Sequence, residues 1–263
     1  MSPVPRRAHV AHLSEREMLG PTLGIFRLEP EEGVPDFQPG QFFLLGLPED
    51  DDEASVVWRA YSVASAPEEK GFLEFYIRWV VHPVEGAFTT RLASKAPGDR
   101  VFWRGPKGQF TVDPDERRLV LVAAGTGVAP FVSTVKHLRA VGSQREVVLC
   151  HGASFADELG YRAFFEDLSR ESTRFRYLPT VSRPMEDRNA RWSGAAGRVH
   201  ELFLGEPSAF EAAVGEPLSP ETCVVHVCGF QGTVDSVLAA LRPRGFRDAV
   251  PGDRCDLKWE SYG

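Results

Sequence analysis

The pattern of apolar residues changes once along this 263-residue chain, near Pro114 to Arg118. Before that point, short runs rich in β-branched and aromatic residues are separated by Gly and Pro, a pattern typical of a small antiparallel β-barrel. The runs expected to form strands are Thr22–Leu28, Gln41–Leu47, Trp58–Ala64, Phe72–Val80 and Arg100–Trp103. We therefore predict a first domain over residues 1–114.

Beyond residue 115 the chain alternates apolar runs with helical segments. The expected strands are Leu119–Ala124, Val147–His151, Phe175–Val181 and Cys223–Cys228, and the expected helical segments are Phe131–Val141, Leu159–Ser169, Arg198–Leu204 and Thr233–Leu241. Such alternation predicts a doubly wound parallel sheet. The predicted fold class is therefore β + α/β, with the α/β domain over residues 115–263.

Composition excludes several classes of protein. Apolar residues make up 43% and charged residues 25% of the chain, which are globular values, and no apolar run reaches the roughly 18 residues of a membrane span. Met1–Val10 lacks the apolar core of a signal peptide. A net charge of -7 argues against a general nucleic-acid binder. We expect a cytoplasmic monomer that binds neither nucleic acid nor membranes.

The four cysteines are too widely spaced for a zinc or iron–sulfur site. Cys150 and Cys223 fall in apolar strand-like runs, where a buried thiol is common. We therefore expect no metal centre and interpret these two cysteines as core residues.

Chemistry should concentrate on the loops that leave the carboxyl ends of the parallel strands. The first such loop, Gly125-Thr126-Gly127, lies between the strand Leu119–Ala124 and a helix. Its glycines let the backbone approach a phosphate closely, and the N–H groups at a helix start favour an anion. Pro130 departs from the last glycine of the usual dinucleotide-binding turn. A nucleotide site and a merely tight structural turn both fit this segment.

Segments in both halves of the chain match one known pattern in the same order. They are Arg59–Ser62, Leu73–Ile77, Gly86–Leu92, Gly125–Pro130, Val181–Arg183, Gly197–Arg198, Cys228–Gly229 and Trp259–Tyr262. Together they resemble the ferredoxin-NADP reductase family along nearly the whole chain. The resemblance implies an FAD-binding β-barrel followed by an NADP-binding parallel-sheet domain.

The resemblance also implies which residues contact the two cofactors. Those expected at FAD are Arg59, Ala60, Tyr61, Ser62, Tyr76, Ile77, Arg78, Gly86, Ala87, Phe88, Thr89, Thr90, Thr126 and Tyr262. Those expected at NADP are Gly125, Gly127, Ser154, Ser182, Arg183, Arg198, Cys228 and Gly229. The candidate catalytic residues are Tyr61, Ser62, Cys228 and Glu260.

The flavin motif has a physical rationale of its own. Alternation along a strand puts Arg59 and Tyr61 on one face, where a guanidinium can pair with a diphosphate and a phenol ring can cover an isoalloxazine. An ordinary barrel strand with an exposed arginine would look the same. The helix start at Gly86 offers backbone donors for the diphosphate, while Phe88 and Leu92 are spaced to face the core. A site for a second phosphate favours FAD over FMN.

Two arginines bear on the choice of nucleotide. By resemblance, Arg183 and Arg198 surround the 2′-phosphate of NADP, and arginine suits a phosphate where an NAD pocket more often offers an acidic group. Alternatively, Arg183 and Arg198 are solvated surface charges that bind no phosphate. Ser154 stands where some bacterial members have a further arginine that grips the nucleotide.

The last parallel strand and the C-terminus supply the remaining candidates. Cys228 and Gly229 end that strand, so they should lie beside the nicotinamide, where a small side chain permits close stacking. A core cysteine would fit the same position. Resemblance aligns Glu260 with an acidic residue that some relatives use for proton or hydride control, and Tyr262 with an aromatic near the flavin. Bacterial relatives commonly end in a further aromatic, and this chain ends at Gly263.

The activity implied is that of a ferredoxin/flavodoxin-NADP reductase, which moves electrons between NADP(H) and a one-electron carrier through FAD. The basic residues that could dock the carrier, unless they are merely solvated, are Lys107, Arg242, Arg244 and Arg247. An NADH-dependent reductase of a multicomponent oxygenase shares most motifs; Arg183, Arg198 and the lack of a fused iron–sulfur domain argue against it. A flavin subunit of a larger electron-transfer complex would be expected to carry clustered cysteines near its C-terminus.

Overall fold

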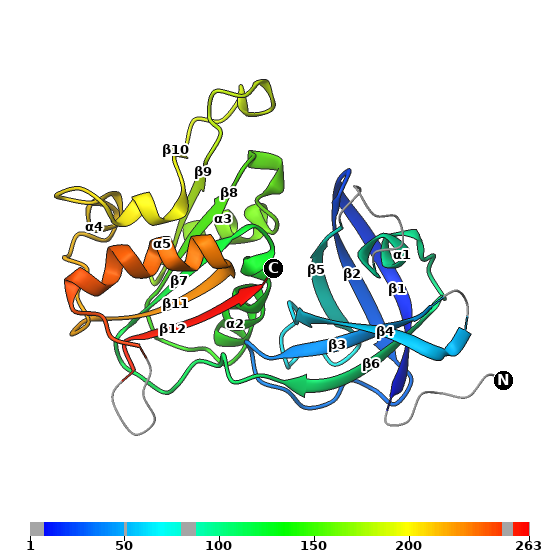
Figure 1. Ribbon diagram of the computed structural model, residues 1–263. Coiled ribbons are helices and arrows are strands. Elements are labelled where there is room, and N and C mark those ends of the chain that lie inside the picture. The colour runs from blue at the N-terminus through cyan, green and yellow to red at the C-terminus, as the bar shows by residue number, and fades with distance from the viewer. Residues whose placement is uncertain (1–7, 50–51, 80–87, 249–254, 263) are drawn as a thin grey trace. The chain divides into compact units, whose positions relative to one another are not determined.

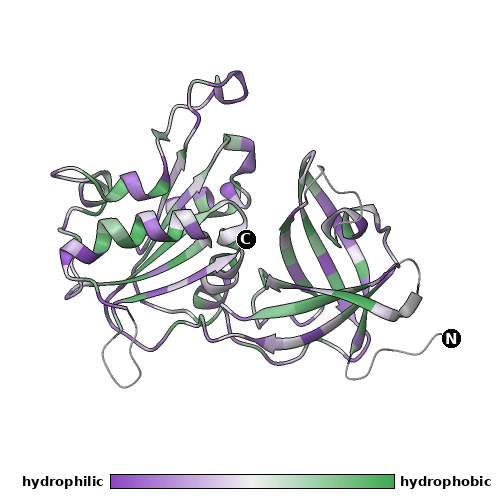
Figure 2. Ribbon diagram, viewed as in Figure 1, coloured by the Kyte–Doolittle hydropathy of each residue, from purple (hydrophilic) through white to green (hydrophobic). Residues whose placement is uncertain are grey.

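The computed structural model describes residues 8–49, 52–79, 88–248 and 255–262 (Figure 1). The chain folds as two compact units, of which unit 1 holds Met1–Val112 with Ala129–Gly142 and unit 2 holds Asp113–Val128 with Ser143–Gly263. Each unit has its own apolar core, and the strands that line these cores carry much of the green in Figure 2. The domain limits expected from the sequence stay a prediction.

Unit 1 is built on a six-stranded antiparallel sheet with the spatial order β4-β3-β6-β1-β2-β5. The strands are β1 (His9–Gly20), β2 (Leu23–Pro30), β3 (Phe42–Glu49), β4 (Asp52–Ser62), β5 (Leu73–Arg78) and β6 (Arg100–Lys107). A β-bridge between Val63 and Phe75 links the end of β4 to β5. The sheet thus curls round and closes as a barrel.

The alternation of side chains along β3 shows how the barrel fills. Phe43, Leu45 and Leu47 are buried in the core, whereas Phe42 and Leu44 between them are only partly buried. Side chains of a strand point alternately to its two faces, so every second residue enters the barrel. The short helix α1 (Phe88–Ser94) adds Phe88 and Leu92 to the same core, as their spacing predicted.

Helix α2 (Ala129–Ala140) belongs to unit 1. The Ser133 hydroxyl donates a hydrogen bond to the Ser65 carbonyl at 2.7 Å, and the Lys136 ammonium lies 3.0 Å from the Glu74 carboxylate. Burial alone would raise the pKa of Glu74, but the Lys136 charge holds that pKa below its ordinary value. A buried ion pair and a buried hydrogen bond therefore attach this helix to the barrel.

Unit 2 is a six-stranded sheet in which all neighbouring strands run parallel, in the order β10-β9-β8-β7-β11-β12. Its strands are β7 (Arg118–Ala124), β8 (Val147–Ala153), β9 (Phe175–Val181), β10 (Ala195–Ala196), β11 (Cys223–Phe230) and β12 (Leu257–Tyr262). The chain first adds strands on one side of β7 and then on the other. Ligands of such sheets bind where this order reverses, at the carboxyl ends of β7 and β11.

Short helices complete unit 2. The α-helices are α3 (Arg162–Glu171), α4 (Ala209–Val214) and α5 (Gln231–Leu241), and the 3-10 turns are η1 (Gly125–Val128), η2 (Ala156–Glu158), η3 (Asp187–Asn189), η4 (Val199–Phe203) and η5 (Arg242–Arg244). Across the residues that the structure covers, no helix is both long and apolar enough to cross a membrane.

The predicted fold class is confirmed, and Cys150 and Cys223 are buried free thiols in strands, as expected. Several local features differ from the predictions. The helical segment expected over Arg198–Leu204 is the 3-10 turn η4, and the sequence patterns did not reveal β1, β10, α4 or β12. Register shifts after Leu13 and Met18 break the two-residue period of β1. Polar residues dominate β12 because it is an edge strand.

Candidate functional site

The glycine turn after β7 lies at the reversal point of the unit 2 sheet. Gly125 adopts a positive φ of 56°, which favours glycine. A Cβ atom built on Gly127 would lie 2.2 Å from the carbonyl oxygen of Cys228, at the end of β11. Real side chains cannot approach so closely, so only glycine fits at residue 127. The turn thus brings bare backbone to the edge where doubly wound sheets bind their ligands.

Tyr262 reaches this turn from β12. Its hydroxyl accepts a hydrogen bond from the Gly127 N–H at 2.7 Å and donates one to the Ala124 carbonyl at 2.8 Å. Its ring also lies 4.9 Å from the ring of Phe230, its partner on β11. A side chain from β12 therefore already occupies one backbone N–H of the turn that was predicted from the sequence to bind phosphate.

Cys228 and Glu260 are paired in register on β11 and β12. Cys228 is only 1% exposed. Burial, together with the nearby Glu260 charge, raises the pKa of its thiol, and burial raises the pKa of Glu260 as well. A neutral thiol can pack against a flat ring but is a poor nucleophile, which agrees with a role in stacking rather than covalent chemistry.

His151 is a buried residue for which the sequence predicted no role. It lies on β8 opposite Ala123, is completely buried, and its Nδ1 is 3.0 Å from the Tyr177 hydroxyl. Burial lowers the pKa of His151 to about 3, so the ring is neutral at physiological pH. The sequence signal was a histidine within an apolar strand. That signal does not show whether neighbouring elements bury the ring.

The outer strands carry four predicted NADP residues, including the two predicted at the 2′-phosphate, to one edge of the sheet. Ser154 follows β8, and its loop is partly buried. Ser182 and Arg183 follow β9, and Arg198 follows β10; all three are exposed or partly exposed on loops. Because β8, β9 and β10 are parallel neighbours, these residues leave the sheet at the same edge. Arg183 lies 3.9 Å from Glu186, a loose pair that solvent weakens.

In unit 1, β4 carries the predicted flavin motif. Arg59 is exposed and donates a hydrogen bond to the Trp58 carbonyl at 2.9 Å. Tyr61 stacks on Phe88, with the ring centroids 5.8 Å apart, and burial raises the pKa of its hydroxyl. The motif therefore pairs an exposed cation with an oriented aromatic ring.

The remaining predicted flavin residues differ in how they can contact a ligand. Tyr76 and Ile77 on β5 are buried at 3% and 1% exposure, so their backbone, rather than their side chains, is what a flavin could meet. Ala60 is exposed, and the partly buried residues are Ser62, Arg78, Thr89, Thr90 and Thr126. Gly229 is buried beside Ala124. Gly86 and Ala87 lie outside the described residues.

Comparison with known proteins relates both units to one family. Residues 11–112 match the model of the oxidoreductase FAD-binding domain, and residues 121–238 match that of the oxidoreductase NAD-binding domain. A ferredoxin NADP+ reductase from Neisseria gonorrhoeae, with bound FAD and NADP, superposes with a TM-score of 0.82 at 26% identity, over 97% of this chain and 98% of that one.

The chain belongs to the ferredoxin-NADP reductase family.

Its FAD-binding and NAD(P)-binding domains make it an oxidoreductase of that family. Two relatives carry different names. The phenol hydroxylase P5 protein of Acinetobacter pittii is 33% identical over 88% of this chain and 60% of its own length. A component of the Na+-translocating NADH-quinone reductase of Klebsiella pneumoniae is 29% identical over 72% of this chain and 46% of its own length. The chain thus spans about half the length of these two relatives.

The residues present fit the two cofactors of the family. Gly127 leaves bare backbone against Cys228 at the sheet's reversal point, where no side chain could be accommodated. Arg59 presents an exposed guanidinium two residues before Tyr61 on β4. A backbone cradle suits a dinucleotide, and a cation with an aromatic ring suits a flavin that ends in a diphosphate.

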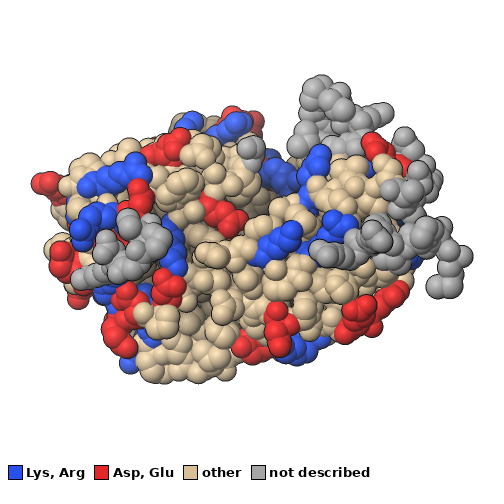
Figure 3. Space-filling view, turned by 60° about the horizontal axis from the view of Figure 1, so that its bottom comes forward, with Lys and Arg blue, Asp and Glu red and all other residues tan. Residues whose placement is uncertain are grey.

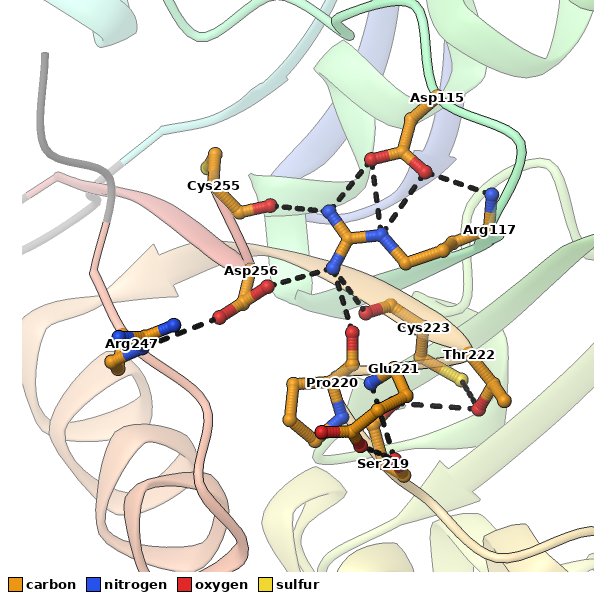
Figure 4. Close-up of polar contacts among 10 residues, drawn as sticks. All are labelled: Asp115, Arg117, Ser219, Pro220, Glu221, Thr222, Cys223, Arg247, Cys255 and Asp256. Atoms are coloured by element: carbon orange, nitrogen blue, oxygen red, sulfur yellow. Dashed lines mark hydrogen bonds and ion pairs between the residues drawn. The ribbon is translucent and has the colours of Figure 1, made fainter. Parts of the chain in front are cut away.

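A buried arginine holds β12 in place for this site (Figure 4). The Arg117 guanidinium donates to Asp115 at 2.6 Å, to Asp256 at 2.7 Å, and to the carbonyls of Pro220 and Cys255, each at 2.7 Å. Its side chain is only 10% exposed. These bonds tie the beginning of β7 to the residues just before β12, so the strand that ends in Tyr262 is anchored at its other end.

Proposed function

We propose that this chain transfers electrons between NADP(H) and a one-electron protein carrier, a ferredoxin or a flavodoxin, with residues 1–114 binding FAD and residues 115–263 binding the nucleotide. The observation that carries the proposal is the pairing of the Gly127 cradle with Arg183 and Arg198 at the same edge of the parallel sheet. When bound, FAD supplies the chemistry itself, taking up hydride from a nicotinamide and releasing electrons singly.

In unit 1 the protein's task is to hold and orient the flavin. Arg59 is proposed to pair with the diphosphate, with the backbone near Thr89 and Thr90 assisting it. Tyr61, fixed by its contact with Phe88, is proposed to cover the isoalloxazine, with Ser62 at the ring edge. None of these groups needs to exchange a proton, which agrees with the raised pKa of the Tyr61 hydroxyl.

In unit 2 the protein's task is to present the nicotinamide and to read the other end of the nucleotide. The glycine turn is proposed to hold the pyrophosphate, and buried Cys228 to give the nicotinamide a small apolar neighbour. Arg183 and Arg198 are proposed to bind the 2′-phosphate, because a guanidinium fork pairs well with phosphate oxygens.

A second candidate function is that of an NADH-dependent reductase component of a multicomponent oxygenase. It is favoured by the 33% identity to the phenol hydroxylase P5 protein and by Ser154, which offers no positive charge after β8. The length of the chain does not separate the two, since the relatives are longer. The two candidates differ in the nucleotide and in the carrier.

Two of the four basic residues that could dock the carrier are already paired within the chain. Arg244 pairs with Glu211 at 2.7 Å and Arg242 with Asp248 at 2.8 Å, so neither offers an unpaired charge to a partner. On the face shown in Figure 3, acidic and basic side chains are interspersed rather than separated by sign. Exposed Lys107 and Arg247 are the remaining basic candidates, and Arg247 lies 3.8 Å from Asp256.

The carrier is tested by mixing the FAD-loaded protein and NADPH with oxidised ferredoxin or with flavodoxin and following the carrier's absorbance. Carrier reduction that depends on both the protein and NADPH supports the proposal. Reduction of neither carrier, with flavin that is reduced normally, would reject that carrier class and favour the oxygenase-type reductase.

The flavin site is tested with Tyr61→Ala and the matched control Tyr61→Phe. The alanine variant should be purified with less FAD, because it loses the ring, and the phenylalanine variant should keep wild-type FAD content. Normal FAD content in Tyr61→Ala would show that stacking of the Tyr61 ring is not needed to hold the flavin.

A further inference from the structure

One buried amide joins the loops that leave β8 and β9. Asn189 is 2% exposed and ends the 3-10 turn η3. Its Oδ1 accepts a hydrogen bond from the Ala156 N–H at 2.9 Å, and its Nδ2 donates to the carbonyls of Ser154 at 3.0 Å and Arg183 at 2.9 Å. Both amide hydrogens and the amide oxygen are thus engaged, all with main-chain groups.

The loops that Asn189 joins also meet through an aromatic ring. The guanidinium of Arg183 lies 5.5 Å from the ring centroid of Phe155, and that of Arg188 lies 4.1 Å from it. Arg188 is committed elsewhere, because its guanidinium lies 2.8 Å from Asp157. Arg183 is 56% exposed and has only the loose contact with Glu186 among the described ion pairs. Of the two guanidinium groups on Phe155, that of Arg183 is the one available to an anionic ligand.

We propose that Asn189 is the positioning residue for nucleotide selection: it fixes the spacing between the Arg183 backbone and the Ser154–Phe155 loop and so sets the preference for a 2′-phosphorylated adenosine. The inference rests on the proposed NADP(H) function and deepens it. Asn189 does not touch the ligand. It acts through the Arg183 carbonyl, so its loss displaces the guanidinium without changing the charge of the site.

The spacing matters because phosphate recognition by arginine is directional. A guanidinium makes two parallel hydrogen bonds only when its plane meets the phosphate oxygens at the correct angle. Without the amide, the Ala156 N–H and the two carbonyls lose their buried partner, and the loops must rearrange to satisfy them. The nicotinamide end is read at β7, β11 and β12, by residues that Asn189 does not contact.

The test measures adenosine 2′,5′-bisphosphate and adenosine 5′-monophosphate binding by calorimetry, on the FAD-loaded full chain. Wild type should prefer the bisphosphate. Asn189→Ala should weaken bisphosphate binding about ten-fold, as expected for a lost buried hydrogen-bond partner, and change monophosphate binding less than about two-fold. In turnover, KM for NADPH should rise while KM for NADH and kcat stay near wild type.

The matched control is Asp187→Ala. Asp187 lies in the same 3-10 turn, is exposed, and its side chain makes no hydrogen bond or ion pair within the described part of the chain. This variant should keep the wild-type preference for the bisphosphate. Loss of preference in Asp187→Ala equal to that in Asn189→Ala would assign the effect to the turn as a whole and overturn the role of the amide.

A second variant tests the two amide hydrogens of Asn189 separately from its amide oxygen. Asn189→Asp preserves the acceptor for the Ala156 N–H but turns a carboxylate oxygen toward the carbonyls of Ser154 and Arg183. It should therefore lose more of the bisphosphate preference than Asn189→Ala. Equal weakening of both probes in these variants, or none, would overturn the inference. A wild type that binds both probes equally would instead reject the NADP(H) preference itself.

Discussion

The two ends of the nucleotide edge of unit 2 are built in opposite ways. At the reversal point, Gly127 packs against Cys228 so closely that no side chain fits, and Tyr262 bonds the same turn. At the outer strands, Arg183 and Arg198 reach solvent on loops. The first region offers backbone held rigidly by its neighbours; the second offers charged side chains.

This difference assigns different tasks to the two regions. Backbone N–H groups recognise a pyrophosphate, which NADP and NAD share, whereas guanidinium groups recognise the 2′-phosphate, which only NADP carries. Substitutions at the reversal point should thus change the binding of NADP and NAD equally. Substitutions at the outer strands should change the binding of NADP alone.

The largest effect is expected from Gly127→Ala. The new methyl group would lie 2.2 Å from the Cys228 carbonyl oxygen, so β11 or the turn must shift. We expect a loss of about 1–3 kcal/mol in the free energy of unfolding and a rise of at least about ten-fold in KM for NADPH and NADH alike. Denaturant titration and steady-state kinetics measure the two quantities.

Gly232→Ala is the matched control for that substitution. Nothing lies within 4 Å of a Cβ atom at Gly232, which is in α5. Alanine there should leave both KM values unchanged and should not lower the free energy of unfolding. If Gly127→Ala behaved like this control, the close approach at the reversal point would have no functional importance.

The next largest effect is expected from the double variant Arg183→Ala with Arg198→Ala. Losing the two guanidinium groups should raise KM for NADPH by about ten-fold or more while KM for NADH changes little. Initial-rate kinetics with each nucleotide provide the measurement. Equal increases of KM for NADPH and NADH would show that the two arginines do not distinguish the nucleotides.

A smaller effect is expected from Tyr262→Phe. This change removes the hydroxyl that occupies the Gly127 N–H while keeping the ring against Phe230. The donor then becomes available to a pyrophosphate oxygen, so KM should fall about two- to five-fold for both nucleotides, the value of one hydrogen bond. A change in KM for NADPH alone would show that Tyr262 acts on the 2′-phosphate end of the nucleotide instead.

The smallest effect is a pH dependence at Glu260. Burial raises the pKa of this carboxyl in the folded chain, so the folded state holds the proton more tightly than the unfolded state does. Stability associated with Glu260 is therefore lost as pH rises above the ordinary carboxyl range. Glu260→Gln cannot ionise and should be more stable than wild type at pH 8 but not at pH 4, measured by denaturant midpoints. The same difference at both pH values would contradict this sign.

Local signals allowed much of the fold to be predicted. The apolar run before Gly125 and the glycines themselves are contiguous, and their meaning depends on neighbours in the chain. β1 was missed because its bulges interrupt the alternation that marks a strand. β12 was missed because an edge strand tolerates polar residues.

The contacts within the site were beyond the sequence for a different reason. Tyr262 bonds Gly127 from 135 residues away, and Asn189 bonds Ser154 across 35 residues. Neither pair is marked by a motif, because the geometry arises only when β12 pairs with β11 and β9 with β8. Resemblance to a family supplied the candidate residues, but not which of them are exposed, buried or already bonded.

The most direct test of the proposed function is anaerobic rapid mixing of the oxidised, FAD-loaded protein with equal concentrations of NADPH and, separately, NADH. The loss of flavin absorbance reports hydride transfer from each nucleotide. We predict fast bleaching by NADPH and much slower bleaching by NADH. Faster bleaching by NADH would contradict the assignment of Arg183 and Arg198 to a 2′-phosphate, and bleaching by neither would contradict hydride transfer at this site.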